Sequence, residues 1–126
     1  MIALQEMYIN SADDKEYSFL GVFDSIENIP QEIQNRAKSS ITNTIIKLNE
    51  YKARLEKYKD SCPMSYKECL MHYEQDKKYL LSKVNDDNCI FDLDNVEDSK
   101  LANWLTWNVQ ASIYFYHKIE LNKLIY

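Results

Sequence analysis

Apolar residues follow two different periodicities along this chain. Over residues 2–9 and 17–23, apolar and polar side chains alternate, and polar residues separate the two runs. A period of two is typical of a half-buried β-strand, so these segments predict a β-hairpin. Gly21 lies inside the second strand, which indicates close packing or a β-bulge at that position.

A helical repeat follows the hairpin. Apolar side chains recur at steps of three and four, which predicts an amphipathic helix over residues 30–60. A straight helix of this length spans about 45 Å, whereas a compact domain of this size is about 36 Å across. The helix must therefore kink, project as an arm or pack against a second copy of the chain.

A second helix is expected after a break that contains Pro63. Proline suits the first helical turn, and Ser65 with Glu68 has the spacing of a capping box. A short link between two helices predicts an antiparallel helical hairpin, which here comprises residues 30–85.

The last third of the chain predicts a short strand, a third helix and a final strand. Residues 89–93 form the short strand, and Asp94 or Asn95 caps the helix that follows. In the final strand, alternate residues are assigned to an inner and an outer face. The inner residues are Ile113, Phe115, His117, Ile119 and Leu121, and the outer residues are Tyr114, Tyr116, Lys118 and Glu120.

These elements predict one α+β domain of 126 residues. The final strand is expected to pair with the N-terminal hairpin, because an exposed apolar strand edge promotes aggregation. The expected fold is a small antiparallel sheet built from residues 1–29 and 86–126, which also supply the third helix. The long helical hairpin of residues 30–85 is inserted between these two parts.

Composition and motifs argue against catalysis. The single glycine excludes glycine-rich phosphate-binding loops, and the sequence contains none of the common hydrolase or metalloprotease signatures. The three cysteines are expected to be reduced, free thiols in a cytoplasm, since no signal peptide or membrane span is visible. A zinc site from Cys62, Cys69, His72 and Cys89 is the alternative, but its spacing matches no common zinc motif. No enzyme activity, metal or cofactor is expected.

The net charge of −5 is unevenly distributed. Residues 31–84 carry eleven basic and seven acidic side chains, whereas the rest of the chain is acidic. A nucleic-acid-binding protein of this size is usually basic overall, so direct binding to nucleic acid is not expected. The basic residues are instead expected to form ion pairs one helical turn apart, as in Glu50–Arg54 and Lys52–Glu56.

Ten tyrosines favour contact surfaces over catalysis. The expected partner-binding residues are aromatic and basic residues of the helical hairpin, together with two aspartates in and directly after the short strand. They are Tyr51, Arg54, Tyr58, Tyr66, Tyr73, Asp92 and Asp94. The alternative is an oligomer that sequesters a small nucleotide signal between subunits, with Arg36, Arg54 and Trp104 holding phosphate and base.

The two ends of the chain resemble small phage and prophage proteins with a ββα…β pattern. The resemblance rests on FLGVFDSIE at Phe19–Glu27 and on FYHKIELN at Phe115–Asn122. It implies a non-catalytic phage or mobile-element protein that binds and inhibits a bacterial defence system or a host nucleic-acid enzyme, in the manner of an anti-CRISPR protein. The expected partner is therefore a bacterial host protein, and homo-oligomers are expected through the helical arm. An immunity protein that neutralises a toxin is a further alternative.

Overall fold

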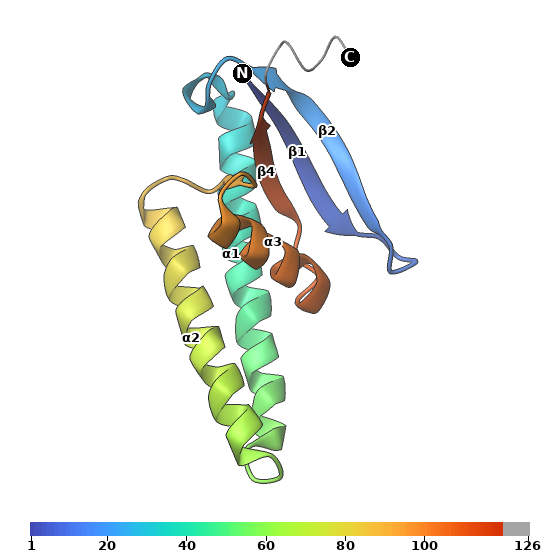
Figure 1. The fold of residues 1–126 in the computed structure, drawn as a ribbon, viewed down its shortest axis with the longest axis vertical. Helices are drawn as coiled ribbons and strands as arrows, with labels where there is room; N and C mark the ends of the chain where they lie inside the picture. Colours follow the sequence, from blue (N-terminus) through green and yellow to red (C-terminus); the bar gives the residue numbers. More distant parts are fainter. Residues whose placement is uncertain (120–126) are drawn as a thin grey trace.

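A computed structural model describes residues 1–119, which form a four-stranded sheet and three α-helices (Figure 1). The strands are β1 (Ile2–Ile9), β2 (Lys15–Phe23), β3 (Phe91–Asp92) and β4 (Ile113–Lys118). The helices are α1 (Gln31–Leu55), α2 (Pro63–Asn85) and α3 (Val96–Asn108), with short 3₁₀ helices η1 (Ile26–Asn28) and η2 (Glu56–Tyr58). The predicted α+β class is confirmed. None of the helices in this part of the chain is long and apolar enough to cross a membrane.

The strand order is β2-β1-β4-β3. β1 pairs antiparallel with both β2 and β4, so the predicted pairing of the final strand with the hairpin is confirmed. β3 pairs with β4 in parallel, which makes the sheet mixed instead of antiparallel as expected. The reason is the connection: α3 carries the chain back across before β4 begins, and such a crossover joins parallel strands.

The irregularity predicted at Gly21 is a β-bulge. The register of the β1–β2 pair shifts between Leu4 and Gln5, which leaves Leu20 as the extra residue of β2. Gly21 has a φ of 147°, a conformation that side chains disfavour. A Cβ added to Gly21 would also lie 3.2 Å from the ring of Phe23, so glycine suits both the backbone and the packing here.

Both faces of β4 are covered where the strand begins. Ile113, Tyr114 and Phe115 are consecutive and all buried, although successive side chains point to opposite faces. The guanidinium of Arg36 in α1 lies 5.7 Å from the ring centroid of Tyr114. The assignment of Tyr114 to the outer face is therefore wrong, because α1 covers that face.

Further along β4, the predicted alternation weakens. His117 was expected inside but is only half-buried, with its ring 5.3 Å from that of Phe115. Lys118 is exposed, as predicted. Glu120 and Leu121, also assigned to this strand, lie outside the described residues.

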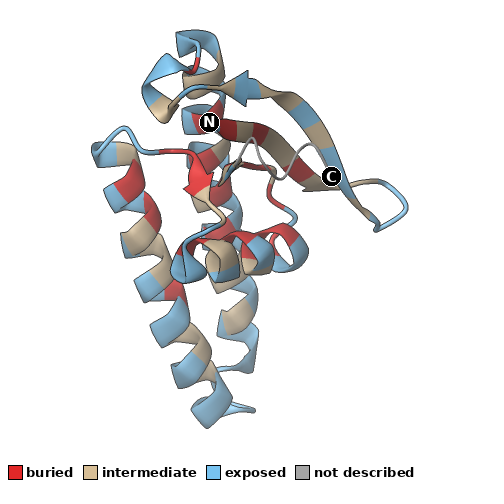
Figure 2. Cartoon of the chain, turned by 45° about the horizontal axis from the view of Figure 1, so that its top comes forward, coloured by how far each residue is buried: buried red, intermediate tan, exposed pale blue. Residues whose placement is uncertain are grey.

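α1 and α2 form the predicted antiparallel hairpin, which extends well beyond the sheet and α3 (Figure 1). Figure 2 shows that buried residues gather beside the sheet and α3, while the far end of the hairpin is exposed or half-buried. None of residues 53–68, which we call the arm tip, is buried. The long helix therefore projects as an arm, one of the three arrangements that its length allowed.

The two later helices begin differently. α2 begins at Pro63 after Cys62, which makes no side-chain capping hydrogen bond. The predicted capping box is wrong, because Ser65 already lies inside the first turn. α3 begins as predicted: Asn95 Oδ1 accepts a hydrogen bond of 3.1 Å from the backbone N–H of Asp98.

A buried ion pair connects α2 to α3. The side chains of Lys83 and Asp98 are 7% and 6% exposed, and Lys83 Nζ donates to Asp98 Oδ2 over 3.1 Å. The same oxygen accepts the backbone N–H of Asp92 at 2.9 Å, and Oδ1 accepts the Tyr79 hydroxyl. We call these four residues the Asp98 network. The buried carboxylate thus has partners from α2 and β3, which offset the cost of removing its charge from water.

Substitution of Asp98 by alanine (Asp98→Ala) is expected to lower the free energy of unfolding by about 3–5 kcal/mol, since it leaves a buried lysine without its counter-ion. Urea unfolding followed by circular dichroism measures the change. The matched control is Lys38→Ala, which removes the exposed Lys38–Asp87 ion pair of 3.2 Å. That change should cost less than about 1 kcal/mol. Equal losses for the two variants would contradict the role of the Asp98 network.

Candidate functional site

A groove lined by aromatic residues lies between α1, α2 and α3. Its volume is about 620 Å³, which is in the range of small-molecule binding sites. Its walls are formed by Tyr51 of α1, Tyr73 and Tyr79 of α2, and Trp104 of α3. The other lining residues are Cys69, His72, Gln75, Asp76, Glu97, Lys100 and Leu101. We call this site the aromatic groove.

The aromatic walls are held in place by contacts within the protein. The rings of Tyr51 and Trp104 meet edge to face, with centroids 5.5 Å apart. The Tyr73 hydroxyl donates to Asn49 Oδ1 over 2.6 Å, and Tyr79 belongs to the Asp98 network. Burial is the largest cause that raises the pKa of Tyr51 and of Tyr79, so both phenols are uncharged at neutral pH.

The polar residues of the aromatic groove include one carboxylate that is partly removed from water. Asp76 is half-buried, and burial raises the pKa of its carboxyl, while the nearby His72 acts in the opposite direction. Within residues 1–119, no ion pair involves Asp76. Glu97 and Lys100 are exposed at the rim. The groove therefore combines apolar walls with a partly desolvated negative charge.

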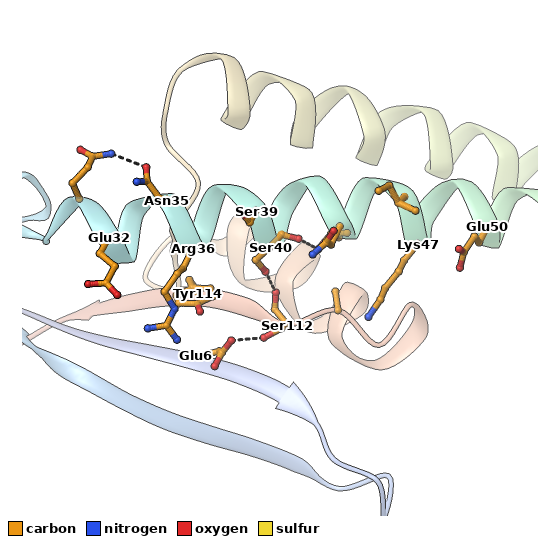
Figure 3. Close-up of a pocket in the computed structure, with 15 residues that line it drawn as sticks. Glu6, Glu32, Asn35, Arg36, Ser39, Ser40, Lys47, Glu50, Ser112 and Tyr114 are labelled. Carbon is orange, nitrogen blue, oxygen red and sulfur yellow. Dashed lines mark hydrogen bonds between the residues drawn. The ribbon is translucent and has the colours of Figure 1, made fainter.

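A second groove, of about 890 Å³, lies between α1 and the sheet. Figure 3 shows Arg36 and Lys47 of α1 directed toward the strands, with Glu6 of β1 and Ser112 facing them. Ser112 Oγ donates to Glu6 Oε2 over 2.6 Å, and Lys47 Nζ donates to the carbonyl oxygen of Gln110 over 2.9 Å. Acidic and basic side chains are mixed here, and several are bonded within the protein. The charges of this polar groove therefore favour neither an anionic nor a cationic ligand.

The predicted tyrosines and Arg54 divide between two parts of the hairpin. Tyr51 and Tyr73 lie in the aromatic groove. Arg54, Tyr58 and Tyr66 lie on the arm tip. There Arg54 and Tyr58 are exposed, and the Tyr66 hydroxyl donates to Glu56 Oε1 over 2.9 Å. The structure therefore places all five on the hairpin, but in two regions.

Asp92 and Asp94 lie outside the hairpin itself, in β3 and in the turn that follows it. Asp92 Oδ1 accepts the backbone N–H of Asp94 at 3.0 Å. Asp94 Oδ2 accepts the backbone N–H of Lys118 at 2.9 Å. These bonds stabilise the turn between β3 and α3 and its contact with β4. Asp94 is exposed and Asp92 is half-buried, and their role in partner binding stays a prediction.

The residues of the alternative nucleotide site do not converge within one chain. Arg36 lines the polar groove, Trp104 lines the aromatic groove, and Arg54 lies on the arm tip. Arg36 and Arg54 are 18 residues apart on α1, which corresponds to about 27 Å along the helix axis. One copy of the chain therefore cannot hold a single nucleotide with all three.

The ion pairs predicted along α1 are absent from the part of the chain that the structure describes. Neither the Glu50–Arg54 pair nor the Lys52–Glu56 pair forms there. Lys52 instead lies over the ring of Tyr73, with its ammonium 5.5 Å from the centroid. The prediction is wrong because α2 packs beside α1 and offers an aromatic face to this lysine.

The three cysteines occupy separate positions. Cys62 precedes α2 and Cys89 follows it, and a helix of 23 residues separates ligands at its two ends by about 35 Å. The zinc alternative with Cys69 and His72 therefore fails on distance. Among residues 1–119, no cluster of three or more His, Cys, Asp or Glu side chains is suited to a metal ion.

Most lining residues of the aromatic groove were not among the predicted binding residues, which include only Tyr51, Tyr73 and Trp104 of this set. Cys69, Asp76 and Tyr79 form, with His72, a stripe at steps of three and four along α2. The stripe lies beside the apolar positions that predicted the helix. It contains both polar and apolar residues, so a search for apolar periodicity does not detect it. A search for helical periodicity among tyrosines and titratable residues, apart from aliphatic ones, would have revealed this face.

Comparisons with known proteins yield no match: no family model, curated protein or solved structure is similar to this chain. The likeness of the chain ends to small phage and prophage proteins therefore stays a prediction.

Alkylation by iodoacetamide is expected to follow the burial of the three thiols. Cys62 is exposed, Cys69 is half-buried in the groove wall, and Cys89 is buried with a raised pKa, mainly through desolvation. Since the thiolate is the reactive form, Cys89 should react at least about tenfold more slowly than Cys62. Peptide mass spectrometry after timed labelling measures the rates, with urea-unfolded protein as the control. Equal rates for Cys62 and Cys89 in the folded protein would contradict this arrangement.

Proposed function

We propose that this protein is a non-catalytic binding protein that engages a partner protein through its helical hairpin. The observation that carries the proposal is the arm tip, where two helices extend beyond the core and bury no residue of the segment 53–68. Tyr58 and Met64 are 56% and 83% exposed there, and Arg54 is exposed beside them. Tyrosine, methionine and arginine are enriched at protein interfaces.

The aromatic groove supports the same proposal. It lies at the base of the arm, where α3 meets the hairpin, so the hairpin offers both a projecting tip and a concave site. Interfaces of high affinity concentrate their binding energy in aromatic and arginine residues around such pockets. Tyr51 and Trp104 supply this chemistry in the groove, and Arg54 with Tyr58 supplies it at the tip.

Within this class, the narrower proposal is inhibition of a bacterial defence system or a host nucleic-acid enzyme by direct binding. Its support is the resemblance of the chain ends to phage and prophage proteins. The immunity protein that neutralises a toxin is the second form of the same mechanism, because it too would act through a surface and not through catalysis. A second copy of the chain bound through the arm is the proposed route to an oligomer.

The double substitution Arg54→Ala/Tyr58→Ala is expected to weaken partner binding about thirtyfold or more, because truncation of interface arginines and tyrosines commonly costs at least about 2 kcal/mol. Affinity capture from nuclease-treated bacterial lysate, quantified by mass spectrometry, identifies the partner. Titration of the purified partner then gives the dissociation constants. Both side chains are exposed, so urea unfolding should show unchanged stability.

The matched control for this experiment is Phe19→Ala on the edge strand β2, where the side chain is 64% exposed. It removes an aromatic ring of similar exposure at a site remote from the arm tip. If the partner is still captured by the Arg54→Ala/Tyr58→Ala variant but not by Phe19→Ala, the proposal is wrong and the binding surface lies on β2. Light scattering on the same proteins reports whether the arm instead joins two copies of the chain.

A further inference from the structure

We propose that the aromatic groove binds an arginine side chain of the partner protein. This inference rests on the proposed function, because it names the partner residue that the hairpin would anchor. The relevant features are the aromatic walls, the partly buried carboxylate of Asp76 and the charge balance of the lining residues.

The aromatic walls favour a cation. The faces of tyrosine and tryptophan rings attract ammonium and guanidinium groups within about 6 Å of the centroid. The protein already uses this attraction beside the groove: Lys52 and Lys77 lie 5.5 and 5.7 Å from the ring centroid of Tyr73. Tyr51 and Trp104 remain half-exposed in the groove wall. A cation that entered from solvent would therefore reach aromatic surface.

Asp76 supplies the complementary charge. Its carboxylate is half-buried and joins no ion pair within residues 1–119. Glu97 adds a second negative charge at the rim, while Lys100 supplies one positive charge. Asp76, Glu97 and Lys100 together give the lining a formal charge of −1. A neutral ligand would leave the partly desolvated carboxylate of Asp76 without a partner.

Arginine fits this combination better than lysine. Its guanidinium is planar, so it stacks on an aromatic face while it donates two parallel hydrogen bonds to a carboxylate. Lysine offers a compact, strongly hydrated charge that cannot do both. The groove of about 620 Å³ exceeds the volume of one side chain, which leaves room for the flanking residues of a peptide. The occupant is therefore an arginine within a polypeptide.

The test uses the full chain with Trp107→Phe, which leaves Trp104 as the only tryptophan. The probe is the peptide acetyl-Gly-Arg-Gly-amide, and the readout is the indole N–H signal of Trp104 in NMR. We expect a saturable shift with the arginine peptide. The citrulline peptide, which keeps the shape but lacks the charge, should bind at least about tenfold more weakly, because it forms no cation–π contact or ion pair. Equal affinities, or no shift with arginine, would overturn the proposal.

The second variant is Asp76→Asn in the same background, which is expected to weaken arginine binding at least about tenfold. It should fold, because it removes a partly buried charge. The matched control is Glu74→Gln, which makes the same change of charge on α2 but lies outside the aromatic groove. That variant should bind the arginine peptide within about twofold of the parent. The carboxylate of Glu74 is exposed, so solvent and salt screen its effect on the groove. If both substitutions weaken peptide binding equally, the effect comes from the overall charge of α2, and the proposed arginine site is refuted.

This titration and the capture experiment fail independently. The peptide needs only the groove, whereas capture with Arg54→Ala/Tyr58→Ala tests the arm tip. Loss of the proposed function would leave the arginine-specific shift of Trp104 intact. Absence of that shift, with capture still dependent on the arm tip, would reject the arginine site alone.

Discussion

The carboxylate of Asp98 is the constraint on which the arrangement of the helices depends. It is the one buried acidic side chain among the described residues, and its partners come from α2 and from the backbone of β3. A buried charge is tolerated only while its hydrogen bonds are made. A shift of α3 along α2 would break the bonds to Tyr79 and Lys83 together. The network thus fixes how α2 and α3 meet, and the walls of the aromatic groove follow from that geometry.

Periodicity in the sequence predicted the helices and strands, because the periods of two and 3.6 are local properties of the backbone. It did not predict the parallel pairing of β3 with β4. It did not predict the buried polar residues, since a search for apolar positions passes over them. They are Thr44, Lys83, Asp98 and Thr106. It also placed Tyr114 on an exposed face. That error arose because one strand cannot show that a helix from a distant part of the chain covers its second face.

The candidate site shows the same limit in a different form. Tyr51 and Tyr58 are seven residues apart on nearly one face of the long helix, as are Tyr66 and Tyr73 on the next. Yet Tyr51 is half-buried against α3 while Tyr58 is exposed, and Tyr73 is buried while Tyr66 is not. The sequence gives the direction in which each tyrosine points. The burial depends on where α3 ends along the hairpin, which only the tertiary structure determines.

The aromatic groove and the arm tip, the two ends of the proposed binding surface, differ in local stability. This difference gives them different parts in binding a partner. At the base, the rings around the groove are held by the Asp98 network and by the bond between Tyr73 and Asn49. A side chain that enters there would cost little ordering of the protein. At the arm tip no residue is buried, and regions with few buried contacts open at low free energy. The tip can therefore adjust to a partner, while the groove sets the position. A fixed groove gives a reason to retain the ion pair of Asp98 with Lys83 in the core. Two apolar side chains could fill the same space, but they form no directional bonds and would leave α3 freer to slide along α2.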